Sequence, residues 1–212
     1  MFKKLMECTP DSTRQWYTNN VIPCMGGEST AGFNIETFYI ENFGTRREYQ
    51  GLGLGTALLS RLEDHARESG GRLGLATVDE RAARLYEKAG FKDIHNAELS
   101  YEDGGETVKL RTMCNDCGLE SWRPASSEAN NNEDGAHQCF RIEEQSECSK
   151  VLFDAFLNDR FTNKLYGHSF RIALVDCEVW VTRVKGDSVE GGTTIASVAC
   201  VPPPGKEVYS QQ

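Results

Sequence analysis

Three closely spaced glycines, Gly51, Gly53 and Gly55, constrain this chain more than any other stretch. The segment before them, Phe38 to Thr45, is rich in aromatic residues and is predicted to be a strand. The segment after them begins an amphipathic helix near Thr56. A glycine-rich turn in this position presents backbone N–H groups at a helix N-terminus, which is a ready site for phosphate. The sequence therefore predicts that the chain holds a phosphorylated cofactor.

Glycine spacing separates this turn from two common phosphate loops. A P-loop requires a Lys directly after its last glycine, but Thr56 follows Gly55. A dinucleotide loop that starts at Gly51 and Gly53 requires a third glycine at position 56, where Thr56 again stands. The pattern that remains is Gln50 followed by Gly53 and Gly55, with an apolar helix behind it.

A second motif lies further along the chain. Residues 79–91 predict a helix that Asp79 caps, with Tyr86 close to its end and Gly90 and Phe91 after it. One predicted helix and one predicted strand separate it from the glycine turn. The two motifs, in this order and at this distance, resemble the acetyl-CoA loop and a later helix of the GNAT superfamily of N-acetyltransferases. Tyr86 lies at helical spacing from Ala82 and Ala89, so it also fits a position in the core.

The resemblance implies a fold class, α/β (α+β), with a GNAT-like mixed, mostly antiparallel twisted sheet flanked by helices. The family's glycine loop lies in the second half of the domain, whereas here it lies near the start. We therefore expect a circular permutation. Residues 1–113 are expected to form the acetyl-CoA-binding half, 114–138 a flexible linker rich in Ser, Asn, Glu and Gly, and 139–212 a segment that resembles the family's N-terminal half.

The same order of segments can also arise in three ways without a permuted domain. Two chains can exchange halves to form a domain-swapped homodimer. The chain can also combine pieces of two tandem copies, or result from an error in gene assembly.

Hydrophobic periodicity places the other elements. Helices are expected near 12–20, over 56–69 and from Ser146, where the apolar positions Cys148, Val151, Leu152, Ala155 and Phe156 share one face. Strands are expected over 33–45, 73–78, 91–94, 107–113, 140–142, 178–184 and 193–201.

The resemblance also implies roles for particular residues. The expected cofactor-binding residues are Phe43, Gly44, Thr45, Gln50, Gly51, Leu52, Gly53, Leu54, Gly55, Thr56 and Asp79. The pantetheine arm of acetyl-CoA is expected to pair with residues 43–45 like an extra strand. Glu41 is the candidate base, with Glu36 as the fallback, and Tyr86 is the candidate acid. A solvated or salt-bridged strand residue without a catalytic role would give the same sequence pattern at Glu41. The family often has Asn where Asp79 stands. An Asn side chain can donate a hydrogen bond to the cofactor, whereas an ionised carboxylate can only accept one.

The implied activity is that of an acyl-CoA-dependent N-acyltransferase, which moves the acetyl group of acetyl-CoA to a primary amine of a small molecule or a protein. The alternative is a CoA-binding or degenerate GNAT-like module with little or no turnover. The sequence does not identify the acceptor.

Charge and hydropathy exclude several classes of partner. The net charge is −9 and Lys and Arg are not clustered, which argues against nucleic acid. No stretch approaches the ~20 apolar residues of a membrane span, and the first residues lack the apolar core of a signal peptide. We therefore expect a cytoplasmic protein that binds no membrane.

The chain contains 8 cysteines, of which Cys114 and Cys117 form a Cys-x-x-Cys pair. A zinc site would need two further ligands at suitable spacing, and His137 with Cys139 is a poor completion. We therefore expect reduced thiols and no metal.

Overall fold

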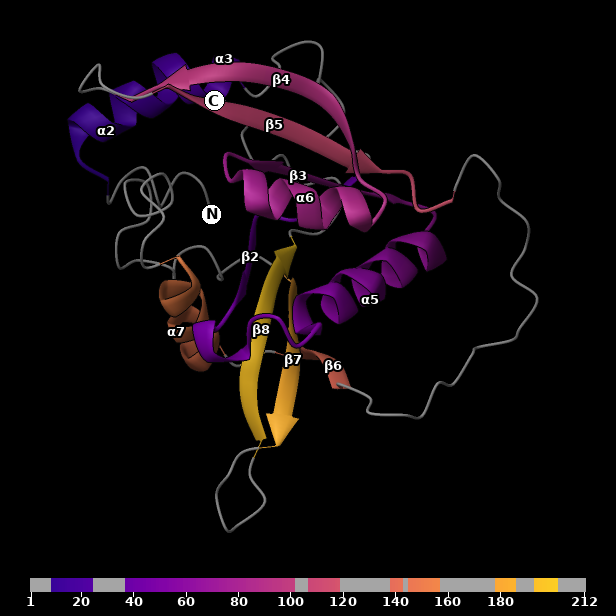
Figure 1. Ribbon diagram of the computed structural model, residues 1–212. Helices are drawn as coiled ribbons and strands as arrows, with labels where there is room; N and C mark the ends of the chain where they lie inside the picture. The colour runs from indigo at the N-terminus through magenta and orange to yellow at the C-terminus, as the bar shows by residue number, and fades with distance from the viewer. Residues whose placement is uncertain are drawn as a thin grey trace.

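The computed structural model describes seven stretches of the chain. They are residues 9–24, 37–101, 107–118, 138–142, 145–156, 178–185 and 193–201. The side chains of 138–142, 145, 146 and 185 are not described. Within these stretches, helices cover two twisted and mostly antiparallel sheets (Figure 1), so the expected mixed α/β fold class is confirmed.

The first sheet is built from the N-terminal half of the chain. Its strands are β1 (Thr37–Tyr39), β3 (Arg72–Thr77), β4 (Lys92–Ser100) and β5 (Thr107–Asn115), in the spatial order β1-β3-β5-β4. β1 and β3 run parallel, and the other pairs are antiparallel.

The second sheet combines one strand of the N-terminal half with three from the C-terminal half. Its strands are β2 (Asn42–Thr45), β6 (Gln138–Ile142), β7 (Glu178–Lys185) and β8 (Thr193–Val201), in the order β2-β8-β7-β6, all antiparallel. β2 pairs with β8 from Asn42 opposite Cys200 to Thr45 opposite Ser197. The two halves of the chain are thus joined by backbone hydrogen bonds.

The segment 37–45 passes from one sheet to the other. The Ile40 amide donates to the Gly74 carbonyl of β3 at 2.7 Å, and the next amide, that of Glu41, donates to the Cys200 carbonyl of β8 at 2.9 Å. The expected single strand over this segment is therefore wrong, because its hydrogen-bond partner changes between two adjacent residues. Residues 33–36 of that prediction lie outside the described stretches.

Helix α5 (Leu54–Glu68) packs on both sheets and starts two residues before its predicted position. One face buries Leu54, Leu58, Leu59, Leu62 and Ala66. Burying each leucine is worth roughly 1.5–3 kcal/mol. The same core cluster contains Trp180, Ala199 and Val201 of β7 and β8, so both halves of the chain contribute to it.

Two more helices flank the sheets. α6 (Glu80–Lys88) follows β3, and α7 (Gln145–Ala155) lies against β2 and β8. A Cβ on Gly44 would lie 2.7 Å from the Ala155 Cβ, so glycine is needed where α7 crosses β2. The predicted helices at 79 and 146 are confirmed.

The N-terminal residues form α2 (Asp11–Trp16), the π-helix η1 (Tyr17–Val21) and α3 (Ile22–Cys24). They pack on β4 and β5 through a cluster that includes Trp16, Leu99 and Leu110. This packing accounts for one correction. β4 is expected to end at residue 94 but continues to Ser100, because Leu99 is buried beneath the helix on an otherwise mostly exposed strand. β5 likewise extends two residues past the expected boundary at 113.

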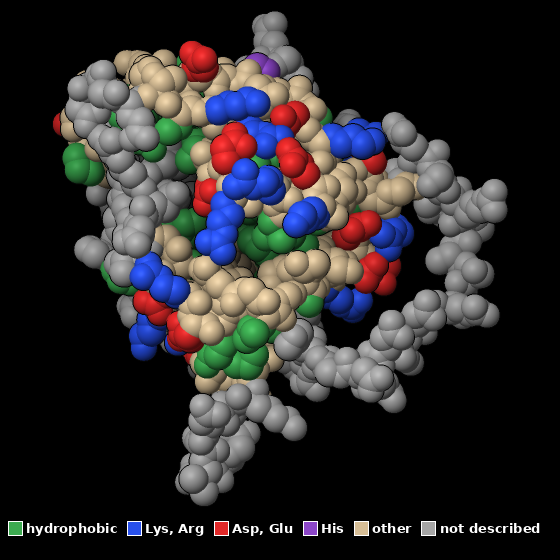
Figure 2. Space-filling view, in the orientation of Figure 1, with side chains coloured by type: hydrophobic (Ala, Val, Ile, Leu, Met, Phe, Trp, Pro, Cys, Tyr) green, Lys and Arg blue, Asp and Glu red, His purple; other side chains and the backbone are tan. Residues whose placement is uncertain are grey.

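Among the described residues, no helix combines the length and the apolar character needed to cross a membrane. On the face shown in Figure 2, acidic and basic side chains are intermixed around α6, beside a small apolar area.

Candidate active site

The glycine turn joins β2 to α5 in a conformation that only glycine adopts without strain. A short 3-10 turn, η3 (Arg47–Tyr49), leads to Gln50, and Gly51 and Gly53 follow with φ of 81° and 78°. The side-chain amide of Gln50 donates to the Thr45 carbonyl at 3.1 Å, which ties the turn to the end of β2. The turn is therefore held in place by its own side chain.

The N-terminus of α5 leaves its backbone donors available. Gly53 is the N-cap and supplies no side-chain hydrogen bond, and the first turn contains no acidic residue. The amides of Leu54, Gly55 and Thr56 have no carbonyl partner within the helix. A Cβ added at Gly51 or Gly53 would meet no atom within 4 Å, so the space beside the turn is open. This arrangement can bind an anion such as a diphosphate.

Strand β2 lies at the end of its sheet in the described part of the chain, where β8 is its strand partner. The strand carries Phe43, Gly44 and Thr45. Because an edge strand has unpaired backbone groups, it can accept an extended ligand as an additional strand. The Cβ side of Gly44 is covered by α7, so the backbone is the part of Gly44 that can contact a ligand.

Phe43 connects the turn to Tyr86. A Cβ on Gly55 would lie 3.5 Å from the Phe43 ring, and the ring centroids of Phe43 and Tyr86 are 6.1 Å apart in an edge-to-face arrangement. The structure thus brings the glycine turn, strand β2 and Tyr86 together.

Tyr86 is 7 % exposed and its ring also packs against Phe91. Burial raises the pKa of Tyr86 well above its usual range, and the nearby charge of Asp79 adds to the effect. The hydroxyl therefore stays protonated at neutral pH and can donate a hydrogen bond. It is, however, a weaker acid than an exposed phenol. Complete transfer of its proton to a thiolate is therefore less favourable than transfer from a tyrosine of ordinary pKa.

Glu41 lies at the point where the chain changes sheets. Its side chain is half-buried, and one carboxylate oxygen, Oε2, is inaccessible to solvent. Its role as base stays a prediction, and the fallback Glu36 lies outside the described residues.

Asp79 caps α6. Its Oδ1 accepts hydrogen bonds from the amides of Arg81 at 2.7 Å and Ala82 at 3.4 Å. The side chain is exposed, and its acceptor capacity serves its own helix. A direct contact between Asp79 and the cofactor stays a prediction.

The sequence reasoning missed Arg111, which holds α6 against the sheet. Its guanidinium donates to Asp93 of β4 at 2.9 Å and to Glu87 of α6 at 2.5 Å, and Glu80 lies 3.5 Å away. Arg111 is itself only 8 % exposed. The available signal was a single charged residue inside the mostly buried run 110–115 of β5.

The Cys-x-x-Cys pair lies at the end of β5, with Cys114 inside the strand and Cys117 two residues beyond it. Burial raises the pKa of Cys114 to about 11 and that of Cys117 to about 12. His137 is outside the described residues and the side chain of Cys139 is not described, so the prediction of no metal stays untested. In the described stretches, no three His, Cys, Asp or Glu residues lie close enough together to hold an ion.

Comparison with known proteins agrees with the motifs. The model of the acetyltransferase (GNAT) family matches residues 24–91, which contain both the glycine turn and the helix of Tyr86. The predicted resemblance to the GNAT superfamily is therefore confirmed over this segment. The comparisons with curated proteins and with solved structures each gave no match.

Proposed function

We propose that the protein transfers the acetyl group of acetyl-CoA to a primary amine, on a small molecule or a protein. The observation that carries the proposal is the uncapped N-terminus of α5 beside the edge strand β2, with Tyr86 linked to both through Phe43. GNAT acetyltransferases in general perform this reaction, and residues 24–91 match that family.

Backbone groups provide most of the proposed cofactor contacts. The amides between Gln50 and Thr56 bind the diphosphate, aided by the dipole of α5. The glycines in this stretch leave room for close approach, because they lack a Cβ. Residues 43–45 pair with the pantetheine arm, and the Phe43 amide donates to the thioester carbonyl and stabilises the charge that develops there.

Two side chains carry the proposed proton transfers. Acetyl-CoA supplies an activated acetyl group with a thiolate leaving group. Glu41, directly or through water, removes a proton from the acceptor ammonium, because only the neutral amine has a lone pair with which to attack. Tyr86 donates a hydrogen bond to the sulfur and releases its proton as the C–S bond breaks. The raised pKa favours a transfer that is concerted with departure of the sulfur.

A thiol-release assay with a panel of amines tests the proposal. The panel covers polyamines, aminoglycosides, amino acids and peptides. The Tyr86→Phe variant is expected to lower turnover while acetyl-CoA affinity stays nearly unchanged. Tyr17→Phe, which removes the hydroxyl of a buried tyrosine on the N-terminal helix, is the control and should keep full turnover. Unchanged turnover in Tyr86→Phe would demote Tyr86 to a core residue.

Two observations support the alternative of a CoA-binding module with little turnover. Tyr86 is a weakened acid, and the carboxylate of Asp79 serves its own helix. Calorimetry distinguishes the two functions: acetyl-CoA binding with no thiol release on any amine supports the module, and absence of binding excludes both.

We also propose that residues 1–113 and 139–212 form one permuted domain connected by 114–138. Three contacts between the two segments support this arrangement: β2 pairs with β8, α5 shares a core with Trp180, and Gly44 contacts α7. A swapped dimer would make the same contacts between two chains. Size-exclusion chromatography with light scattering separates them, because a strict monomer excludes the swap. Deletion of 139–212 should unfold the rest.

The remaining expectations stay predictions. They are a cytoplasmic location, an amine acceptor as the substrate partner, and no binding to nucleic acid or membrane.

A further inference from the structure

A cavity of about 420 Å³ lies between the N-terminal helix and the end of β4, within the 300–1,000 Å³ usual for small-molecule sites. Its lining residues lie at 12–20 and at 100–101, outside the segment 24–91 that matches the acetyltransferase family. The site just described uses none of them. The cavity is therefore a separate feature of the molecule.

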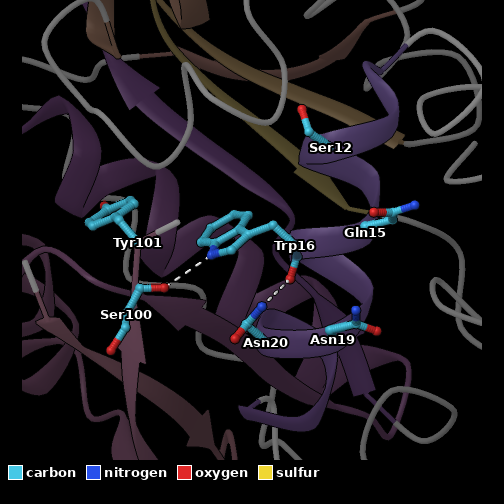
Figure 3. Close-up of a pocket in the computed structure, with 7 residues that line it drawn as sticks. All are labelled: Ser12, Gln15, Trp16, Asn19, Asn20, Ser100 and Tyr101. Atoms are coloured by element: carbon cyan, nitrogen blue, oxygen red, sulfur yellow. Dashed lines mark hydrogen bonds between the residues drawn. The ribbon is translucent and has the colours of Figure 1, made fainter. Parts of the chain in front are cut away.

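The floor of the cavity is well packed. Trp16 and Tyr101 are stacked with centroids 6.0 Å apart and planes 9° from parallel, and both belong to a buried cluster with Leu99 and Leu110. The indole N–H of Trp16 donates to the Ser100 carbonyl at 3.0 Å, which joins the helix to β4 (Figure 3). The cavity is thus an open depression above two side chains that are themselves only 4 % and 5 % exposed.

Among the described residues that line the cavity, the exposed side chains are polar and uncharged. Five exposed side chains contribute hydroxyl or amide groups: Ser12, Gln15, Asn19, Asn20 and Ser100. The side-chain amide of Asn20 donates to the Trp16 carbonyl at 3.0 Å, which fixes its orientation in Figure 3. Each Asn or Gln amide is both donor and acceptor, as each hydroxyl of a ligand is. Charged ligands, including CoA phosphates, find no opposite charge among these residues.

The helix is irregular where it lines the cavity. Asn19 and Asn20 lie in the π-helix η1, where the Ile22 amide donates to the Tyr17 carbonyl five residues earlier. Pro23 follows and has no amide hydrogen, so the Thr18 carbonyl cannot receive the next bond of this register. π-helices are rare and occur frequently at functional sites.

From the packed floor, the uncharged donor and acceptor groups of the described lining and the π-helix, we propose that this cavity binds a neutral, hydroxyl-rich ligand of about the size of one sugar ring. The amides of Gln15 and Asn19 contact its hydroxyls. This site acts independently of the proposed acetyl transfer.

Nuclear magnetic resonance on the full chain tests the proposal without acetyl-CoA. Methyl glucoside and methyl N-acetylglucosaminide are the neutral probes, and glucuronate and glucosamine are the charged ones. Neutral probes should shift the indole N–H signal of Trp16 with millimolar affinity, and the charged probes should bind more weakly. The experiment can fail while acetyl-CoA still binds, so the two proposals are separable.

Variants locate the binding. Gln15→Ala and Asn19→Ala should each weaken it roughly three- to tenfold, the value of one hydrogen bond. Thr18→Ala, an exposed residue of the same π-helix outside the cavity, is the matched control and should keep full affinity. The proposal is overturned if no neutral sugar shifts Trp16, if only charged probes or simple amides do, or if the variants bind as the unaltered protein does.

Discussion

Helices α5 and α6 both follow a strand, yet their N-termini are built in opposite ways. α6 begins at Asp79, whose carboxylate accepts two of the first amides, and Glu80 adds a negative charge to the first turn. α5 begins at Gly53, with no capping side chain and no acid in its first turn. One helix satisfies its own backbone donors, and the other leaves them for a partner.

The difference shows how a chain can reserve a site for an anion. A glycine N-cap costs α5 roughly a few tenths of a kcal/mol relative to a Ser, Thr, Asn or Asp cap. The contacts that compensate are tertiary, since five apolar residues of α5 are buried against both sheets. Such a helix stays folded while its N-terminal amides remain available to bind a ligand. The following predictions test this comparison.

The largest effect is expected for Gly53→Glu. A carboxylate about 4 Å from a phosphate near the surface costs roughly 4 kcal/mol, so acetyl-CoA should bind at least ~100-fold more weakly by calorimetry. Gly70→Glu is the matched control, because Gly70 has a φ of 67° with open space around it and lies at the other end of α5. Retained affinity in Gly53→Glu would discredit the turn as the diphosphate site.

A second effect is expected on the pH dependence of stability, through the buried Tyr86. The pKa of Tyr86 is raised in the folded protein, mainly by burial. The stability that its neutral hydroxyl contributes is therefore fully present below the ordinary pKa near 10 and is lost as the pH rises toward the raised value, by up to about 1.4 kcal/mol per pH unit. Urea unfolding at about pH 9 and about pH 11 should show a shallower decline for Tyr86→Phe than for the parent. Tyr49→Phe, at a half-buried tyrosine, should keep the steep decline.

A smaller effect is expected at the cap of α6. Asp79→Ala removes two hydrogen bonds to backbone amides and should lower the free energy of unfolding by about 1 kcal/mol. Asp79→Asn should keep most of that stability, since Asn is also a good N-cap. Calorimetry with acetyl-CoA on the same variants tests the predicted contact of Asp79 with the cofactor. A large loss of affinity in both would show that Asp79 contacts the cofactor.

The smallest effect has opposite signs for stability and binding. Thr56 is exposed at the third position of α5, where Thr56→Glu places a charge beside the uncapped amides. Unfolding should become about 0.3–1 kcal/mol less favourable, while acetyl-CoA binding weakens. Thr56→Gln is the uncharged control. If Thr56→Glu leaves both quantities unchanged, the N-terminus of α5 is not an anion site.

The sequence predicted the features that local patterns encode. The glycine turn, the cap at Asp79 and the apolar faces of α5 and α7 follow from spacing and side-chain chemistry, and the structure has them in these places. The family motifs likewise predicted which segments meet, namely β2, the turn and the helix of Tyr86.

Features set by tertiary contacts were not predictable in this way. The change of sheet between Ile40 and Glu41 depends on which carbonyls lie opposite each amide. The full length of β4 depends on a helix from the start of the chain, and the ion pairs of Arg111 join residues distant in sequence. None of these leaves a periodic signal.

The position of β2 at the border of its sheet has a practical consequence. Such borders recruit strands from neighbouring molecules, and proteins normally protect them. In the proposed complex the pantetheine arm covers this border, so the cosubstrate also acts as a shield against aggregation. Protein stored without coenzyme should aggregate sooner than protein stored with it. Coenzyme added before the protein is concentrated is expected to protect yield as well as activity.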